Sequence, residues 1–117
     1  MPWVSVTGLR LHSPLRFPLF LWHAVGSMRQ AQAAPGNLLA EARSLAGVQH
    51  TLTVWQSREA MRAYLRDGAH LAAMRAFPRI GTGTTCGYDA AAVPSWDEAL
   101  AHWRAHARPV GAAPGRA

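Results

Sequence analysis

The sequence predicts an α+β domain with a ferredoxin-like βαββαβ order, an antiparallel sheet and one extra helix at the C-terminus. Two observations predict it. Segments that alternate apolar and polar residues, which is typical of strands, are interleaved with segments whose apolar residues recur at helical spacing. The length of 117 residues and the hydrophobic content of 50% fit one globular domain. We assign that domain to residues 1–108 and expect residues 109–117 to form a flexible tail.

The first half of the chain contains three predicted strands and one helix. Residues 3–11 alternate valine with serine and threonine, which predicts the first strand. Residues 18–33 carry an apolar stripe at helical spacing, and the Pro-Gly pair that follows ends the helix. Residues 38–44 are a weaker strand candidate, whereas residues 48–56 are rich in β-branched and aromatic residues and predict a strand clearly.

The second half predicts helices, a strand and a final helix. Ser57 is the expected N-cap of a helix that reaches Gly68, and a second helical piece covers residues 70–77. Residues 80–89 place threonines, a cysteine and a tyrosine on one side and glycines on the other, as in a strand with an open face. The last helix begins at Ser95, which has the capping-box spacing to a glutamate three residues later.

The pleat of residues 48–56 predicts the two faces of the sheet. His50, Leu52 and Val54 point to one face, while Thr51, Thr53 and Trp55 point to the other. We expect the helices to cover the face of Leu52 and Val54. The opposite face is then bare, and a second copy of the chain is expected to cover it in a homodimer.

Charge and cysteine content restrict the partners only loosely. The 12 basic residues are all arginine and outnumber the 6 acidic ones, but this accompanies a high alanine content that indicates a codon bias. RNA-recognition domains share the βαββαβ order, yet their pattern of glycines and exposed aromatic residues is missing, so no specific nucleic acid is expected.

Cys86 has no disulfide partner within the chain, which favours the cytoplasm. The apolar stretch 17–25 is too short to span a membrane, and no membrane partner is expected.

The middle of the chain resembles a known family. Residues 51–74 (TLTVWQSREAMRAYLRDGAHLAAM) contain a strand ending in Trp, a Ser-led helix and a Gly-Ala-His turn, and Pro35-Gly36-Asn37 follows the first helix. This layout is similar to the antibiotic-biosynthesis-monooxygenase-like proteins, which are dimeric α/β barrels, and more loosely to the spheroidene monooxygenase group. The resemblance implies oxidation of a hydrophobic or aromatic small molecule. It leaves the cofactor open, because the superfamily includes cofactor-free oxygenases, haem-degrading and haem-binding enzymes, and members without known activity.

The resemblance suggests two catalytic candidates, His70 and Trp55. The haem-degrading branch uses an Asn on the first strand, a Trp on the third and a His on the following helix. Trp55 occupies the position of that Trp, but the first strand offers Ser5 and Thr7 in place of an Asn, and His70 lies farther along the chain. His70 could ligate haem iron or move a proton, and a hydrogen-bonded core histidine explains it equally well.

A hydrophobic ligand in the sheet cavity is expected to contact further side chains. The predicted substrate-binding residues are Trp55, Thr53, Thr51, Tyr88 and Met74. His102 and His106 have the i, i+4 spacing of metal ligands, but the sequence offers no third ligand near them, so no metal site is predicted. The alternative to an oxygenase is a noncatalytic dimeric module of the same fold that binds a ligand or has a structural role.

Overall fold

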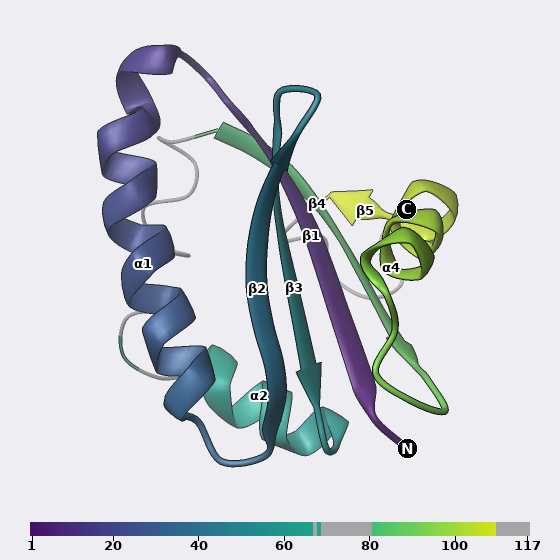
Figure 1. Ribbon diagram of the computed structural model, residues 1–117. Helices are drawn as coiled ribbons and strands as arrows, with labels where there is room; N and C mark the ends of the chain where they lie inside the picture. The colour runs from purple at the N-terminus through teal and green to yellow at the C-terminus, as the bar shows by residue number, and fades with distance from the viewer. Residues whose placement is uncertain (67, 69–80, 110–117) are drawn as a thin grey trace.

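One five-stranded antiparallel sheet forms the centre of the computed structural model, which describes residues 1–66, 68 and 81–109 (Figure 1). The strand order is β2-β3-β1-β4-β5. The strands are β1 (Trp3–Leu11), β2 (Asn37–Leu45), β3 (Val48–Trp55), β4 (Gly81–Asp89) and β5 (Arg108–Pro109). The helices are the short 3-10 helix η1 (Pro14–Arg16), α1 (Phe17–Ala33), α2 (Arg58–Leu65) and α4 (Trp96–His106). The predicted α+β, ferredoxin-like class with an additional C-terminal helix is confirmed.

Local signals in the sequence explain where the helices begin. The Ser57 hydroxyl accepts a hydrogen bond from the amide of Ala60 at 3.2 Å, which caps α2 as predicted. The Ser95 hydroxyl accepts from the amide of Glu98 at 3.2 Å and lies 3.2 Å from the Glu98 carboxylate, so Ser95 caps α4. The predicted helical piece at 70–77 lies outside the described residues.

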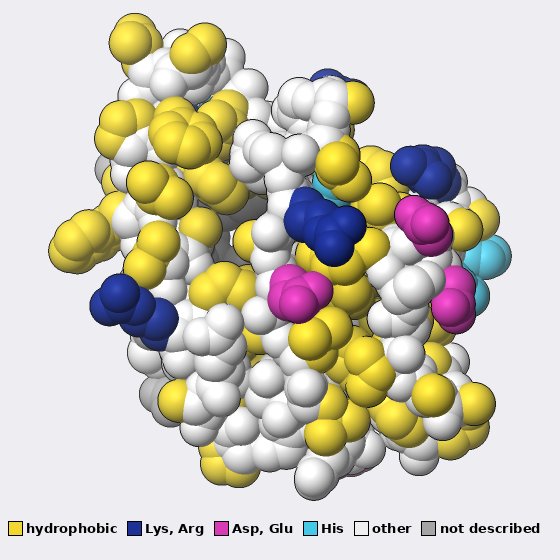
Figure 2. All heavy atoms as spheres, in the orientation of Figure 1, with side chains coloured by type: hydrophobic (Ala, Val, Ile, Leu, Met, Phe, Trp, Pro, Cys, Tyr) yellow, Lys and Arg dark blue, Asp and Glu magenta, His cyan; other side chains and the backbone are white. Residues whose placement is uncertain are grey.

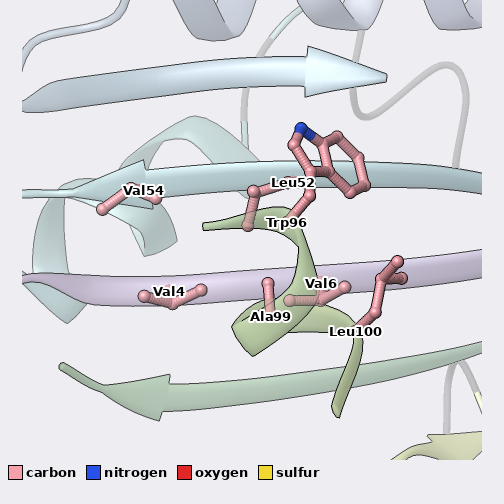
Figure 3. Packing of buried hydrophobic residues seen from close by; sticks show 7 residues of the cluster. All are labelled: Val4, Val6, Leu52, Val54, Trp96, Ala99 and Leu100. Atoms are coloured by element: carbon pink, nitrogen blue, oxygen red, sulfur yellow. The ribbon is translucent and has the colours of Figure 1, made fainter. Parts of the chain in front are cut away.

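Two separate cores lie on the two faces of the sheet. On one face, α4 packs on β1 and β3 through a cluster of buried residues (Figure 3). Its members are Val4, Val6, Leu52, Val54, Trp96, Ala99 and Leu100. On the other face, α1 and α2 pack on the sheet through Ala31, Ala40, Trp55 and Tyr64. Each fully buried valine, leucine or aromatic side chain contributes about 1.5–3 kcal/mol, so both faces contribute to stability.

The expectation that helices cover one face of the sheet and leave the other bare is wrong, because both faces are covered. The pleat of β3 is as predicted, but α1 and α2 cover the face of Thr53 and Trp55, and α4 covers the face of Leu52 and Val54. The hydrophobic pattern cannot decide between the faces because both are apolar. The side of α1 is fixed by the right-handed crossover between the parallel strands β1 and β2, given the strand order. The Trp55 face is therefore not left bare for a second copy of the chain.

The C-terminal end of the domain extends slightly further than predicted. Pro109 pairs with Thr84 and Arg108 pairs with Thr85, so β5 includes the first residue of the expected tail. Residues 110–117 lie outside the described part. Within the described residues, no helix has the length and apolar character needed to cross a membrane.

Candidate functional site

A groove separates the first half of α1 from the sheet. Its volume is about 310 Å³. The wall on α1 consists of the apolar residues Phe17, Phe20, Leu21, Ala24, Val25 and Met28, followed by Arg29. The floor includes Ala42, Ser44 and Gln49, which lie on the α1-facing side of β2 and β3. In Figure 2, hydrophobic side chains gather over α1 beside this hollow. A concave, mostly apolar site of this size suits a small hydrophobic molecule.

A strip of hydroxyl groups continues the floor of the groove. The strip, which we call the hydroxyl strip, consists of Ser5, Thr7, Thr51, Thr53 and Thr85 on neighbouring strands. Thr7 pairs with Thr51 on β3 and with Thr85 on β4, and the hydroxyls of Thr7 and Thr51 are hydrogen-bonded to each other. Thr51 pairs on its other side with Ala42, which lines the groove. The strip therefore begins where the groove ends.

Trp55 lies on the same face but within the core. It is fully buried, and its ring centroid is 5.0 Å from that of Tyr64. Among the described residues, its indole N–H finds no hydrogen-bond partner. The Tyr64 hydroxyl donates to the Ser27 carbonyl at 3.0 Å, and burial raises the pKa of Tyr64 to about 12. Trp55 and Tyr64 thus form a packed wall in which the phenol is neutral at physiological pH.

Tyr88 does not belong to this face, which corrects its grouping with Thr51 and Thr53. It pairs with Val4 on the α4 side of the sheet, and its ring stacks on His102 with centroids 3.8 Å apart. Burial is the largest cause that raises the pKa of the Tyr88 phenol. The reason is the pleat: even-numbered residues of β4 face α4, whereas its glycines and Thr85 share the face of the hydroxyl strip.

The His50 side chain contacts both β1 and α4, which the sequence did not predict. Its Nδ1 lies 3.1 Å from the Thr7 carbonyl, so this nitrogen carries the proton and donates. Its ring meets the Trp103 ring edge-on with centroids 4.7 Å apart. Burial lowers the pKa of His50, the bond to Thr7 opposes this, and Arg104 and Arg10 lower it further. A neutral His50 fixes the backbone that carries the Thr7 hydroxyl.

Two predicted site residues, His70 and Met74, lie outside the described residues. Among the residues that the structure describes, no group of three or more His, Cys, Asp or Glu could hold a metal ion. His102 and His106 are exposed on α4, with ring centroids 5.7 Å apart.

The described residues of the groove do not fit haem. An axial ligand needs an imidazole, thiolate or phenolate that faces the iron. Among the described residues that line the groove, His50 is the one histidine, and its ring packs edge-on against Trp103 of α4. Cys86 is buried on the α4 side, and burial raises the pKa of its thiol. Tyr64 is engaged with Ser27. We therefore derive no step through haem.

Comparison with known proteins finds similar solved structures. No protein-family model matches the sequence. No curated protein matches it either. Among solved structures, Rv0793 from Mycobacterium tuberculosis superposes with a TM-score of 0.73 at 12% identity, over 81% of this chain and 100% of that one.

Two further structures are named for oxygenation. SnoaB from Streptomyces nogalater, described as a cofactor-independent oxygenase, has a TM-score of 0.62 at 16% identity, over 79% of this chain and 95% of that one. An antibiotic biosynthesis monooxygenase has a TM-score of 0.67 at 14% identity, over 79% of this chain and 99% of that one. At these identities the likeness concerns the fold. The chain therefore has the ferredoxin-like α+β fold of the antibiotic-biosynthesis-monooxygenase-like proteins.

Proposed function

We propose that the protein is a small oxygenase that oxidises a hydrophobic or aromatic molecule in the groove between α1 and the sheet, without bound haem. The observation that carries the proposal is the apolar groove of about 310 Å³ whose floor continues into the hydroxyl strip. The shared fold with SnoaB, described as a cofactor-independent oxygenase, supports this reaction class.

The chemistry requires a substrate that supplies its own electrons to oxygen. A carbon acid loses a proton, and the resulting carbanion adds O2 to give a hydroperoxide. Loss of water then leaves a carbonyl. Where the carbon acid is a methylene group in a ring, one methylene group and one O2 give one carbonyl group and one water molecule. The apolar side chains of α1 contact the rings of the substrate, and the hydroxyls of Thr7 and Thr51 can hydrogen-bond to an oxygen on which charge develops.

Of the two catalytic candidates, we assign proton transfer to His70, which lies outside the described residues. Trp55 is fully buried against Tyr64 and does not line the groove, so its proposed role is to support the sheet. Thr53 and Met74 complete the proposed contacts. Tyr88 is left out because it lies on the α4 side of the sheet.

A noncatalytic binding module of the same fold is the second candidate. One observation favours it: within the described part of the groove, His50 is the only imidazole, no carboxyl, thiol or phenol is present, and the His50 ring is already bonded and packed. Such a module would bind the same hydrophobic ligand and consume no oxygen.

We also propose a homodimer in the cytoplasm as the working form. The resemblance supports the dimer, and the single cysteine fits a reducing compartment. The interface cannot be the face of Trp55, because α1 and α2 of the same chain already cover that face.

The test uses a variant that fills the groove. Ala42→Phe places a ring on the groove floor, and Ala101→Phe on the exposed side of α4 is the matched control. The probe is anthrone, an aromatic ketone whose central methylene is a carbon acid. We measure its binding by fluorescence and its oxidation by an oxygen electrode. Ala42→Phe should weaken both by roughly tenfold or more, which corresponds to about 1.4 kcal/mol, and Ala101→Phe should leave both unchanged.

The outcomes separate the two candidates. Equal uptake of oxygen and anthrone, with a carbonyl product, supports the oxygenase. Binding that Ala42→Phe abolishes, without oxygen uptake by the wild type across a series of carbon acids, identifies the noncatalytic module. Binding that Ala42→Phe does not change would show that the groove is not the site.

A further inference from the structure

The 3-10 helix η1 and the first half of α1 expose a cluster of large hydrophobic side chains. Leu15 is 89% exposed and Trp22 78%, and Phe17, Leu21 and Val25 are each more than 40% exposed. We call these five residues the α1 patch. Trp22 lies on the outward side of α1, and Val25, one helical turn further on, lies with Leu21 at the edge of the groove, so the patch runs from the outward side of the helix to the groove. Figure 2 shows hydrophobic side chains over the upper part of this helix. An exposed apolar patch of this kind usually marks an interaction surface.

The charges around the α1 patch are of one sign. Arg16 immediately precedes α1, and Arg29 follows Val25 by one helical turn. Both arginines are exposed. No aspartate or glutamate occurs in residues 1–40, whereas the same segment holds three arginines. The titratable groups of this segment other than the arginines and the N-terminus are His12 and His23, which add positive charge when protonated. The patch is therefore apolar at its centre and basic at its borders.

We propose that the α1 patch docks on the surface of an anionic lipid bilayer. Trp22 and Leu15 would insert at the level of the headgroups, and Arg16 and Arg29 would contact lipid phosphates. An interfacial helix binds through buried apolar area together with attraction to anionic lipids, and the α1 patch supplies both. This surface association revises the expectation of no membrane partner, which rested on the shortness of the apolar stretch 17–25.

Charge complementarity disfavours a second copy of the chain as the occupant. In a two-fold interface the same patch meets itself, so Arg16 and Arg29 of one copy would approach like charges of the other. A nucleic acid would match the charge, but its phosphates would leave Trp22 and Leu15 without an apolar environment.

The α1 patch is continuous with the groove. Phe17, Leu21 and Val25 belong to the patch and also line the groove. If the proposed function holds as well, a membrane-dissolved hydrophobic substrate could reach the groove along this surface. Docking itself does not depend on that function, and it is measured without turnover.

The experiment is co-sedimentation of the full chain with vesicles. Vesicles of phosphatidylcholine alone are compared with vesicles of phosphatidylcholine and phosphatidylglycerol in equal parts, at low and high salt. Trp22→Gln tests the apolar anchor, and Val93→Gln is its control because Val93 is 48% exposed on the loop before α4. The pair Arg16→Gln and Arg29→Gln tests the charge, and Arg104→Gln on α4 is its control.

We expect wild-type protein to bind the anionic vesicles, with weaker binding at high salt. Trp22→Gln should reduce the partition coefficient by roughly tenfold or more, and the arginine pair should reduce it on anionic vesicles only. The two controls should bind like the wild type. The emission of Trp22 should shift to shorter wavelength on binding, and Trp22→Phe should remove that shift while it preserves most of the binding.

Three results would overturn the proposal. The first is no binding to anionic vesicles at low salt. The second is an equal loss in Val93→Gln and Trp22→Gln. The third is a mass of two chains in the absence of lipid that Trp22→Gln converts to one, which would make the α1 patch a self-interface. Failure of docking differs from failure of the proposed function, because Ala42→Phe should lose ligand binding and still bind vesicles.

Discussion

Substitution of Gly8 by alanine tests how α4 is held against the sheet. Gly8 is buried at the centre of β1, and a Cβ atom there would lie 2.4 Å from Cζ2 of Trp103 and 3.2 Å from Cε1 of His50. Trp103 cannot move freely, because its ring contacts His50 and its Nε1 donates to the Thr84 carbonyl at 3.4 Å. Gly8→Ala must therefore push α4 away from the sheet or turn Trp103 out.

The free energy of unfolding should fall by a moderate amount. Overpacking of a well-filled core costs about 1–3 kcal/mol. Alanine offsets about 0.5–1 kcal/mol of this cost because it restricts the unfolded chain more than glycine does. The net destabilisation is then about 0–2.5 kcal/mol, and each kcal/mol lowers the midpoint of thermal unfolding by about 4 °C in a domain of this size.

Urea unfolding of four proteins measures this effect and its cause. They are the wild type, Gly8→Ala, Trp103→Ala and the double variant. Without the indole of Trp103, only the His50 ring remains close to the added methyl group, and that ring can shift into the space that the indole leaves. Gly8→Ala should then become neutral or stabilise by up to about 1 kcal/mol. An equal cost of Gly8→Ala in both backgrounds would refute the close packing of Gly8 against Trp103.

Two other predictions concern pH and assembly. The pKa of His50 is lowered in the folded state, chiefly by burial, so the unfolded chain binds the proton first as pH falls. Stability should therefore decrease as pH falls from 6.5 to the lowered pKa, with a slope of up to about 1.4 kcal/mol per pH unit. Urea unfolding of His50→Gln should lack this slope, and an unchanged slope would contradict the assignment. For assembly, light scattering should find twice the 12.7 kDa of one chain, and single chains at all concentrations would exclude the proposed dimer.

The strands were predictable because alternation and β-branching are local signals. The pleat of β3 was also predictable, and it correctly placed Leu52 and Val54 opposite Thr53 and Trp55. The side on which α1 and α2 lie was not. That choice depends on the handedness of the crossover and on strand order, which are properties of the whole chain.

The candidate site was predictable only in part, for a similar reason. Thr51 and Thr53 were expected on one face, and the structure places them in the hydroxyl strip. Tyr88 was grouped with them although the register of β4 on β1 places it on the other face. The role of His50 depends on its position beside the Thr7 carbonyl, 43 positions away in the sequence, which no local pattern reveals.

The groove follows from a gradient of side-chain size along α1. Near its C-terminal end the helix buries Ser27 and Ala31, and Ala31 shares a core cluster with Ala40, so small residues let the helix approach the sheet closely. Near its N-terminal end the sheet-facing positions carry Phe17 and Phe20, whose ring centroids are 6.1 Å apart. Large rings hold this end of the helix away from β2 and leave a space that they only partly fill. The same gradient explains why apolar residues of α1 that helical spacing predicts to be buried lie instead at the rim of the groove. At the rim they can contact a ligand in the groove and also form part of the α1 patch.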